Sequence, residues 1–330
     1  MTRQTGFTLL ELLVVVAILS AIAMASFGLT ASDRVATARI EDTNARLSHL
    51  RRATLGLETP SWDGAVRLSG YVADNGTLPG SVAALVSKPD SFSEQKGLQP
   101  EFYKDLDSAC LPAGGTPYPT NVTLVKGHRG NYLSGLAHNG EFRDGWGNVS
   151  QTGDDADNFG WLLKFSSAPD DTQLTFTSLG INNDLNNEID EAERNRKITI
   201  APNDWQVDLN GWQVKLKNPT GIPGDFYVAL LVFENTNTGG QWRQFRSRTC
   251  SDDGDWDSEG NCTLNFAEEV TCRSGFKREA HVPLGRHLLL LVKEDNTPRY
   301  PGGDDSKPVI SARPAFYPGT VLPDLVLEVR

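Results

Sequence analysis

The sequence predicts an α+β protein with one long N-terminal helix, a small antiparallel β body and a C-terminal all-β, sandwich-like domain. Three observations lead to this prediction. The residues from Phe7 to Phe27 are apolar with a single charge, no proline occurs before Pro60, and short strand-like segments fill the chain beyond Pro202. A proline-free stretch allows an unbroken helix, and repeated short strands between turn residues are typical of a sandwich.

The apolar segment that begins the predicted helix reads FTLLELLVVVAILSAIAMASF and has 21 residues. At a rise of about 1.5 Å per residue it is roughly 30 Å long, which matches the hydrocarbon core of a bilayer. It is longer than the apolar core of a secretory signal peptide, about 7–15 residues. Because Arg3 precedes it and an acidic body follows, the positive-inside tendency predicts a single-pass membrane protein with its N-terminus inside and its body outside the cytoplasm.

Glu11 is the only charge in this segment. A carboxylate near the centre of a membrane costs about 2.5–3.5 kcal/mol on insertion scales. A charge kept at that cost needs a partner, and a cation brought by another molecule is the simplest one. The alternative is a single-pass anchor in which Glu11 has no role.

The helix changes character after Thr30. Ile40, Leu47, Leu50 and Leu57 recur at helical spacing, while charged residues occupy the other faces. We therefore expect a helix over residues 7–58, half in lipid and half laid on a globular body. Gly28 lies near the change and, at about 1 kcal/mol relative to alanine, is a point where the helix can bend.

The remaining chain divides near residue 201. Residues 59–200 are rich in turn signals, with a short helix expected at Ser81–Ser87 and strands expected at Trp161–Phe165, Leu174–Ser178 and Lys197–Ile200. Residues 201–330 contain seven short alternating or apolar segments, which we predict to be strands: Trp205–Leu209, Trp212–Lys217, Phe226–Glu234, Trp242–Arg248, Thr263–Phe266, His287–Lys293 and Leu325–Val329.

The charge and the absence of catalytic motifs exclude several functions. The formal net charge is −11, and no stripe of Lys and Arg is present to contact phosphates, so no nucleic-acid partner is predicted. The sequence contains no H-E-x-x-H pair, no G-x-S-x-G motif and no P-loop. We therefore predict that the protein is not an enzyme. A membrane-tethered hydrolase would need a catalytic pair that the sequence does not show.

The four cysteines, Cys110, Cys250, Cys262 and Cys272, have neither the C-x-x-C spacing nor the neighbouring histidines of a zinc site. Outside the cytoplasm they are disulfide candidates, and four cysteines allow three pairings. We favour Cys250–Cys262, which would close an acidic loop between two strand-like segments. The alternative is that the cysteines are reduced and buried.

The segment Gly6–Glu11, G-F-T-L-L-E, followed by an apolar helix, resembles the prepilin signature of type IV pilins and type II secretion pseudopilins. In that family an inner-membrane prepilin peptidase cuts after the glycine and methylates the new N-terminal amine. The resemblance implies a leader of residues 1–6 and cleavage between Gly6 and Phe7. It also implies that Glu11 meets the Phe7 amine of a neighbouring subunit during assembly.

The body resembles a stretched major pseudopilin. Tyr71–Val86 is similar to the helix end and loop of those proteins, and D-G-W-G-N at Asp144–Asn148 resembles their D-P-W-G-N turn, with Gly145 in place of proline. Ser178-Leu179-Gly180 then resembles the start of their acidic calcium loop. Residues 87–143 read as an insertion.

Two acidic segments are candidate Ca²⁺ sites, because calcium takes six to eight oxygen ligands in flexible geometry. The first places oxygen donors at every second position, Asp184, Asn186, Glu188 and Asp190. Its alternative is a solvated acidic turn. The second has the same spacing at Asp253, Asp255, Asp257 and Glu259. Its alternatives are surface solubility and a contact with a partner protein.

Together these features predict a minor or specialised structural subunit of a type IV pilus or a type II secretion pseudopilus-like filament. Its partners would be other pilin or pseudopilin subunits, the prepilin peptidase and the inner membrane. Its globular part would lie in the periplasm or on an extracellular filament. The alternative is a membrane-anchored binding protein or adhesin, displayed by a prepilin-type anchor without polymerising.

Overall fold

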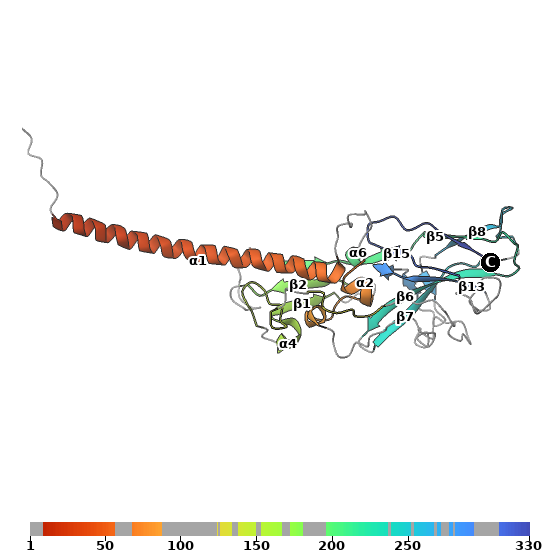
Figure 1. Ribbon diagram of the computed structural model, residues 1–330, viewed down its shortest axis with the longest axis horizontal. Helices are drawn as coiled ribbons and strands as arrows, with labels where there is room; N and C mark the ends of the chain where they lie inside the picture. The colour runs from red at the N-terminus through yellow and green to blue at the C-terminus, as the bar shows by residue number, and fades with distance from the viewer. Residues whose placement is uncertain are drawn as a thin grey trace, which may run out of the picture.

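The computed structural model describes residues 9–56, 68–87, 124, 126–133, 138–149, 153–166, 172–180, 196–236, 239–251, 254–266, 269–271, 277–279, 281–293 and 310–330. It describes the backbone alone for residues 25–33, 235–236, 239–244, 269–271 and 277–279. In the described part of the chain, a long helix extends from one end of an elongated protein, and the C-terminus lies towards the opposite end (Figure 1).

The described helices are α1 (Leu9–Leu55), α2 (Tyr71–Asn75), α3 (Ala83–Val86), α4 (Asp155–Asn158) and α6 (Pro202–Trp205). The first half of the described strands comprises β1 (Trp161–Phe165), β2 (Leu174–Ser178), β3 (Lys197–Ile200), β4 (Gln206–Asp208), β5 (Gln213–Lys217), β6 (Phe226–Thr236), β7 (Gly239–Arg246) and β8 (Asn261–Asn265). The others are β9 (Glu269–Thr271), β10 (Lys277–Glu279), β11 (His281–Pro283), β12 (Gly285–Arg286), β13 (Leu288–Lys293), β14 (Ser311–Ala312), β15 (Ala315–Phe316) and β16 (Leu325–Glu328).

Helix α1 is continuous over 47 residues, so Gly28 does not interrupt it. It ends at Leu55 rather than at the predicted residue 58, because Gly56 adopts a φ of +92°, a conformation that favours glycine. Its C-terminal half is amphipathic as predicted, with Leu47 and Leu50 buried against the body. Among the described residues, no helix is both long enough and apolar enough to cross a membrane.

A first hydrophobic core joins the C-terminal half of α1 to the antiparallel sheet β1-β2-β3. These three strands have the bounds that the sequence predicts. Trp161 on β1 is 2% exposed and donates its indole N–H to the carbonyl oxygen of Phe142 at 2.7 Å. Helices α2 and α3 pack into the same core, where their apolar side chains cover the last turns of α1.

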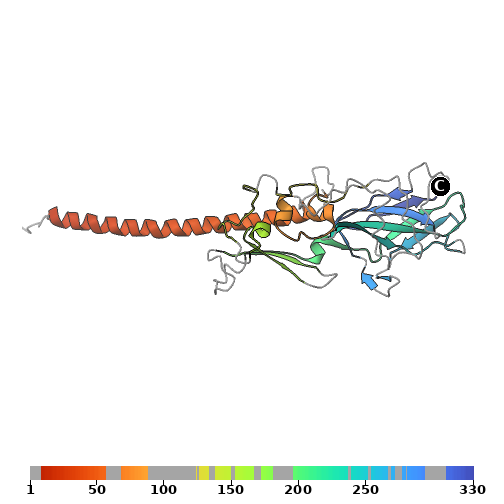
Figure 2. The same cartoon turned by 90° about the horizontal axis from the view of Figure 1, so that it is seen from below.

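A second hydrophobic core lies between two sheets, β14-β13-β6-β7 and β16-β5-β8. Strand β6 pairs with β13 and with β7 in antiparallel register, and β16 pairs with β5 in parallel. Trp212 belongs to this core, where its ring stacks on Phe266 at 4.8 Å between ring centroids and lies edge-on to Phe316 at 5.0 Å. These strands gather at the end of the molecule opposite to the projecting helix (Figure 2).

The prediction that Trp205 begins a strand is wrong. Trp205 ends α6, which starts at Pro202 and is capped by the Asp204 carboxylate, the acceptor of the Ala201 N–H at 2.8 Å. A proline at the first helical position and an acid in the first turn both favour this short helix. The Trp205 ring belongs to the first core, and its indole N–H donates to Thr172 O at 3.0 Å.

Candidate functional site: the N-terminal helix and the turn that holds it

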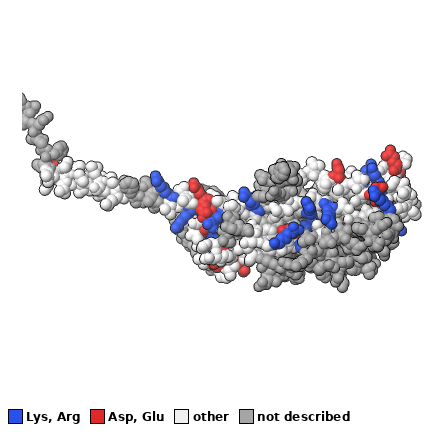
Figure 3. Space-filling view, in the orientation of Figure 1, with Lys and Arg blue, Asp and Glu red and all other residues white. Residues whose placement is uncertain are grey.

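Glu11 lies in the first turn of α1, on the part of the helix that projects from the body. Residues 9–24 are exposed throughout, including Leu9 at 82% and Leu10 at 74%. Charge is sparse on the visible face of this projection (Figure 3). So much contiguous apolar surface is far beyond what a soluble monomer leaves in water, and it marks a surface for lipid or for other chains. Gly6 and Phe7 lie outside the described residues.

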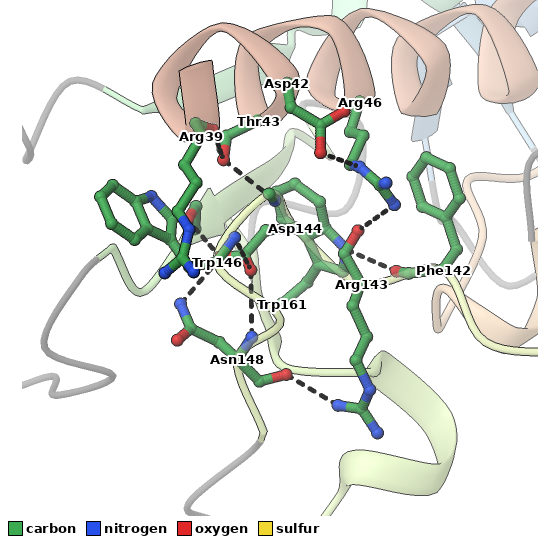
Figure 4. Close-up of polar contacts among 12 residues, drawn as sticks. Arg39, Asp42, Thr43, Arg46, Phe142, Arg143, Asp144, Trp146, Asn148 and Trp161 are labelled. Atoms are coloured by element: carbon green, nitrogen blue, oxygen red, sulfur yellow. Dashed lines mark hydrogen bonds and ion pairs between the residues drawn. The ribbon is translucent and has the colours of Figure 1, made fainter. Parts of the chain in front are cut away.

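The turn at Asp144–Asn148 is shaped by the Asp144 carboxylate, which is 4% exposed. Its Oδ1 accepts the backbone N–H groups of Trp146 and Asn148, each at 3.1 Å. Its Oδ2 accepts the side-chain N–H of Asn148 at 2.8 Å. A buried carboxylate with this many donors is satisfied, so the turn has a defined shape (Figure 4).

Gly145 brings this turn into contact with α1. Its backbone N–H donates to Thr43 Oγ1 at 3.1 Å, and the Thr43 hydroxyl donates to Arg39 O at 2.8 Å. A Cβ on Gly145 would collide with the Arg39 carbonyl oxygen. Gly145 therefore supplies both the N–H and the space for this contact, and a proline at this position would supply neither.

Two arginines extend the contact between α1 and the turn. Arg46 on α1 pairs with Asp42 at 2.9 Å and donates to Arg143 O at 2.9 Å. The guanidinium of Arg143 forms two hydrogen bonds to Asp155, at 2.9 and 2.7 Å, and a third to Asn148 O at 2.7 Å. The hydrogen bonds to Asp155 raise the pKa of Arg143 further above its ordinary value, so it stays charged.

Trp146, at the tip of the turn, lies between two cations. The guanidinium carbons of Arg39 on α1 and of Arg196 before β3 are 5.4 and 5.5 Å from its ring centroid. These distances are within the range of cation–π attraction, about 0.5–1 kcal/mol at exposed sites and more when desolvated. The indole ring therefore links α1 to the start of β3.

The same turn holds both ends of the first acidic segment. Asp144 Oδ2 accepts the Ser178 hydroxyl at 2.6 Å, and the side-chain N–H of Asn148 donates to Gly180 O at 2.8 Å. The Ser178 N–H donates to Arg196 O at 3.1 Å, which brings the two ends of the segment together. The predicted calcium ligands within it, Asp184, Asn186, Glu188 and Asp190, lie outside the described residues.

The second acidic segment is closed by a disulfide between Cys250 and Cys262, which confirms the favoured pairing. Asp257 Oδ1 accepts the N–H groups of Glu259 and Asn261, at 2.9 and 2.7 Å, and hydrogen bonds from Asn261 lower the pKa of Asp257.

The Asp255 carboxylate accepts the Ser251 N–H at 2.8 Å, so in this segment both described aspartates hydrogen-bond to their own loop. Asp253, Cys110 and Cys272 lie outside the described residues. In the part of the chain that the structure describes, no group of three or more His, Cys, Asp or Glu side chains is placed to share a metal ion.

A family model for the prokaryotic N-terminal methylation motif matches residues 1–27. Comparison with curated proteins and with solved structures gives no significant match. The match supports a type IV pilin-like or pseudopilin-like precursor, and a motif of this kind suggests anchoring through the N-terminal helix.

The sequence pointed to Glu11 and to the turn at Asp144–Asn148, but it did not predict the contacts that join this turn to α1. The motif around Glu11 is a linear pattern, and the resemblance of D-G-W-G-N to a known turn pointed to Asp144. The contacts of Thr43 with Gly145 and of Arg46 with Arg143 join residues 102 and 97 positions apart. Spacing carries no signal for such pairs.

Proposed function

We propose that this protein is a structural subunit, minor or specialised, of a type IV pilus or a type II secretion pseudopilus-like filament. The observation that supports it best is the combination of the methylation motif at residues 1–27 with an exposed helix that carries Glu11 in its first turn. In this proposal the prepilin peptidase cuts after Gly6, and Phe7 becomes the methylated N-terminus.

The assembly step follows from the cost of a carboxylate in an apolar environment. Glu11 on one subunit pairs with the Phe7 amine of the next, and the apolar side chains around Glu11 pack into the filament core. An ammonium–carboxylate contact in low dielectric is strong when made and expensive when missing. A subunit that docks in the wrong axial register leaves both charges unpaired. The pair therefore fixes the axial spacing between neighbouring subunits.

In this proposal the turn at Asp144–Asn148 attaches helix α1 to the globular body. A filament subunit transmits force from its helix to its globular part. The Gly145–Thr43 and Arg46–Arg143 contacts resist sliding of α1, and the bidentate pair of Arg51 with Asp204 extends the attachment to α6. The body would face the periplasm or the outside of the cell.

The size of the region beyond residue 201 supports a minor or specialised role. It has its own core, at the far end of the molecule from the anchor (Figure 1). This position also favours a second candidate function, a membrane-anchored binding protein or adhesin that does not polymerise. In either case the β region would supply the specific contact, because the helix alone supplies anchorage.

A substitution of Glu11 separates the two candidates. Glu11→Ala should leave membrane insertion and cleavage intact and should abolish incorporation into sheared filaments, because the Phe7 amine loses its partner. Glu41→Ala, an exposed glutamate on the body-proximal part of α1, is the matched control and should incorporate normally. Incorporation of Glu11→Ala at the wild-type level would contradict the role given to Glu11. Absence of the wild-type protein itself from sheared filaments would rule out the filament subunit and leave the displayed binding protein.

We also propose that Asp184, Asn186, Glu188 and Asp190 bind one Ca²⁺ ion. Support comes from their spacing and from the hydrogen bond of the Ser178 N–H to Arg196 O, which brings the two ends of the segment together beside Asp144 and Asn148. Excess chelator should lower the melting temperature of the full chain in detergent, and added calcium should restore it. An unchanged melting temperature in chelator would remove the calcium proposal and leave the filament proposal untouched.

A further inference from the structure

Helix α2 forms the contact between the two cores. All five of its residues are buried, and it packs against α1 on one side and against β12 and β6 on the other. Gly285 on β12 allows the close approach, since its φ is +141° and a Cβ there would lie 3.1 Å from Ala73 O. We call this contact of Tyr71–Asn75 with Gly285–Arg286 the junction.

Lys126 lies inside the junction. It is 6% exposed, and its ammonium donates to Ala73 O on α2 at 2.8 Å. A Cβ on Gly285 would be 3.2 Å from its Nζ, so the amine occupies the space between α2 and β12. A lysine in such a place has lost its water, and a carbonyl dipole compensates only part of that loss.

The described charges that act on Lys126 leave it poorly compensated. Asp74 on α2 is the acid, and its carboxylate already binds Arg129 Nε at 3.1 Å and the Tyr132 hydroxyl at 3.1 Å. Arg129 and Arg286, the latter on β12, are like charges that oppose the ammonium. Protonation of Lys126 therefore places a third positive charge beside Arg129 and Arg286, and the Asp74 carboxylate that attracts it is already paired with Arg129.

Three other titratable groups near Lys126, namely His287, Tyr71 and Tyr132, keep one charge state near neutral pH. His287 is buried, donates through Nε2 to Pro283 O at 2.8 Å, and has its pKa lowered to about 3 by burial and by Lys126. Burial also raises the pKa values of Tyr71 and Tyr132, which stay neutral. The His128 ring is held between Ala84 O, at 2.8 Å from Nε2, and the Gly130 N–H, at 3.2 Å from Nδ1.

We propose that the junction is a proton-sensitive contact, in which protonation of Lys126 loosens the packing of β12 on α2 and deprotonation tightens it. Geometry supports this, because the amine lies between the two elements and opening is what returns it to water. The inference does not depend on filament assembly. It makes the attachment of the C-terminal β region to the helix-bearing body respond to the acidity around the protein.

The direction of the pH dependence follows from linkage. Burial lowers the pKa of Lys126 to about 7 when the junction is closed, and opening returns it towards its ordinary value near 10.4. The closed junction therefore has its full stability when the pH is above the pKa of Lys126 in the open form. It loses stability as the pH falls towards the pKa of Lys126 in the closed form. Within this window the opening constant should rise about tenfold for each unit of falling pH, and it should level off below about pH 7.

Hydrogen exchange on the full chain in detergent tests this directly. In the regime where exchange reports the opening equilibrium, intrinsic amide exchange rises about tenfold per pH unit while the opening constant of the junction falls by the same factor. Exchange at Gly127, which donates to Asp74 O, and at Leu284, which donates to Trp205 O, should therefore be nearly flat between about pH 7.5 and 9.5.

Two variants complete the test. Lys126→Met removes the titrating amine, and exchange at Gly127 and Leu284 should regain the full tenfold rise per pH unit. Lys215→Met, at an exposed position on β5, should leave the flat profile unchanged. A tenfold rise per pH unit at both amides in the wild type would overturn the proposal, even if Lys126→Met fails to fold. A flat profile that persists in Lys126→Met would also overturn it.

Discussion

Gly145 lies against α1 so closely that its backbone N–H reaches the side-chain oxygen of Thr43 at 3.1 Å, although 102 positions separate the two residues. Thr43 is fully buried, and its hydroxyl also donates to Arg39 O, so one side chain serves both the helix and the turn. The N-terminal helix is therefore held by a specific polar contact as well as by its apolar face.

A proline at position 145 should weaken the contact. Gly145→Pro removes the N–H donor and places a Cβ against Arg39 O, and the two effects should lower the free energy of unfolding by about 1–3 kcal/mol. Denaturant unfolding of the full chain in detergent measures the change. Gly80→Ala is the control, because a Cβ there meets nothing within 4 Å. Equal free energies of unfolding for Gly145→Pro and wild type would show that the contact between the turn and α1 does not stabilise the protein.

Asp144→Asn should destabilise the protein while preserving size and shape. The substitution replaces a carboxylate that accepts four hydrogen bonds, from two backbone and two side-chain donors, with an amide that has one acceptor oxygen. Hydrogen bonds to buried charged groups contribute about 1.5–3 kcal/mol. Asp157→Asn, at an exposed position on α4, should change the unfolding midpoint little. A similar midpoint for both variants would contradict the role assigned to Asp144.

Loss of the Cys250–Cys262 disulfide should destabilise the second core. Replacing both cysteines with serine, which opens a link between residues 12 positions apart, should cost about 2–4 kcal/mol. The wild type should show the same loss of thermal stability in reducing agent, and the double variant should be insensitive to it. Sensitivity of the double variant would assign the effect to another cysteine pair.

The pair of Arg51 with Asp204 should couple α1 to α6 modestly. Both side chains are about a quarter to a third exposed, so solvent screens the pair, and a double-mutant cycle should give about 0.5–1 kcal/mol. Asp204→Ala should cost more than Arg51→Ala, because Asp204 also accepts the Ala201 N–H that begins α6. Equal losses in the two single variants would contradict the capping role.

The elements that sequence predicted well are those with a long or clean pattern. The N-terminal helix has no proline to break it, strand β1 is a short, mostly apolar run, and strands β2 and β3 alternate apolar and polar residues. The strands it missed, such as β11, β12 and β15, have two or three residues each, and their pairing depends on distant partners. The Lys126 site was missed for the same reason, because Ala73, Lys126 and Gly285 are far apart in the sequence and come together only in the fold.

The central claim is that residues 1–6 are a leader and that Phe7 is the mature N-terminus. The most direct measurement is the mass of the N-terminal peptide of the protein isolated from its own cells. The account predicts a peptide that begins at Phe7 and is one methyl group heavier than its sequence. A peptide that begins at Met1 or Thr2, or one that begins downstream of Glu11, would contradict it.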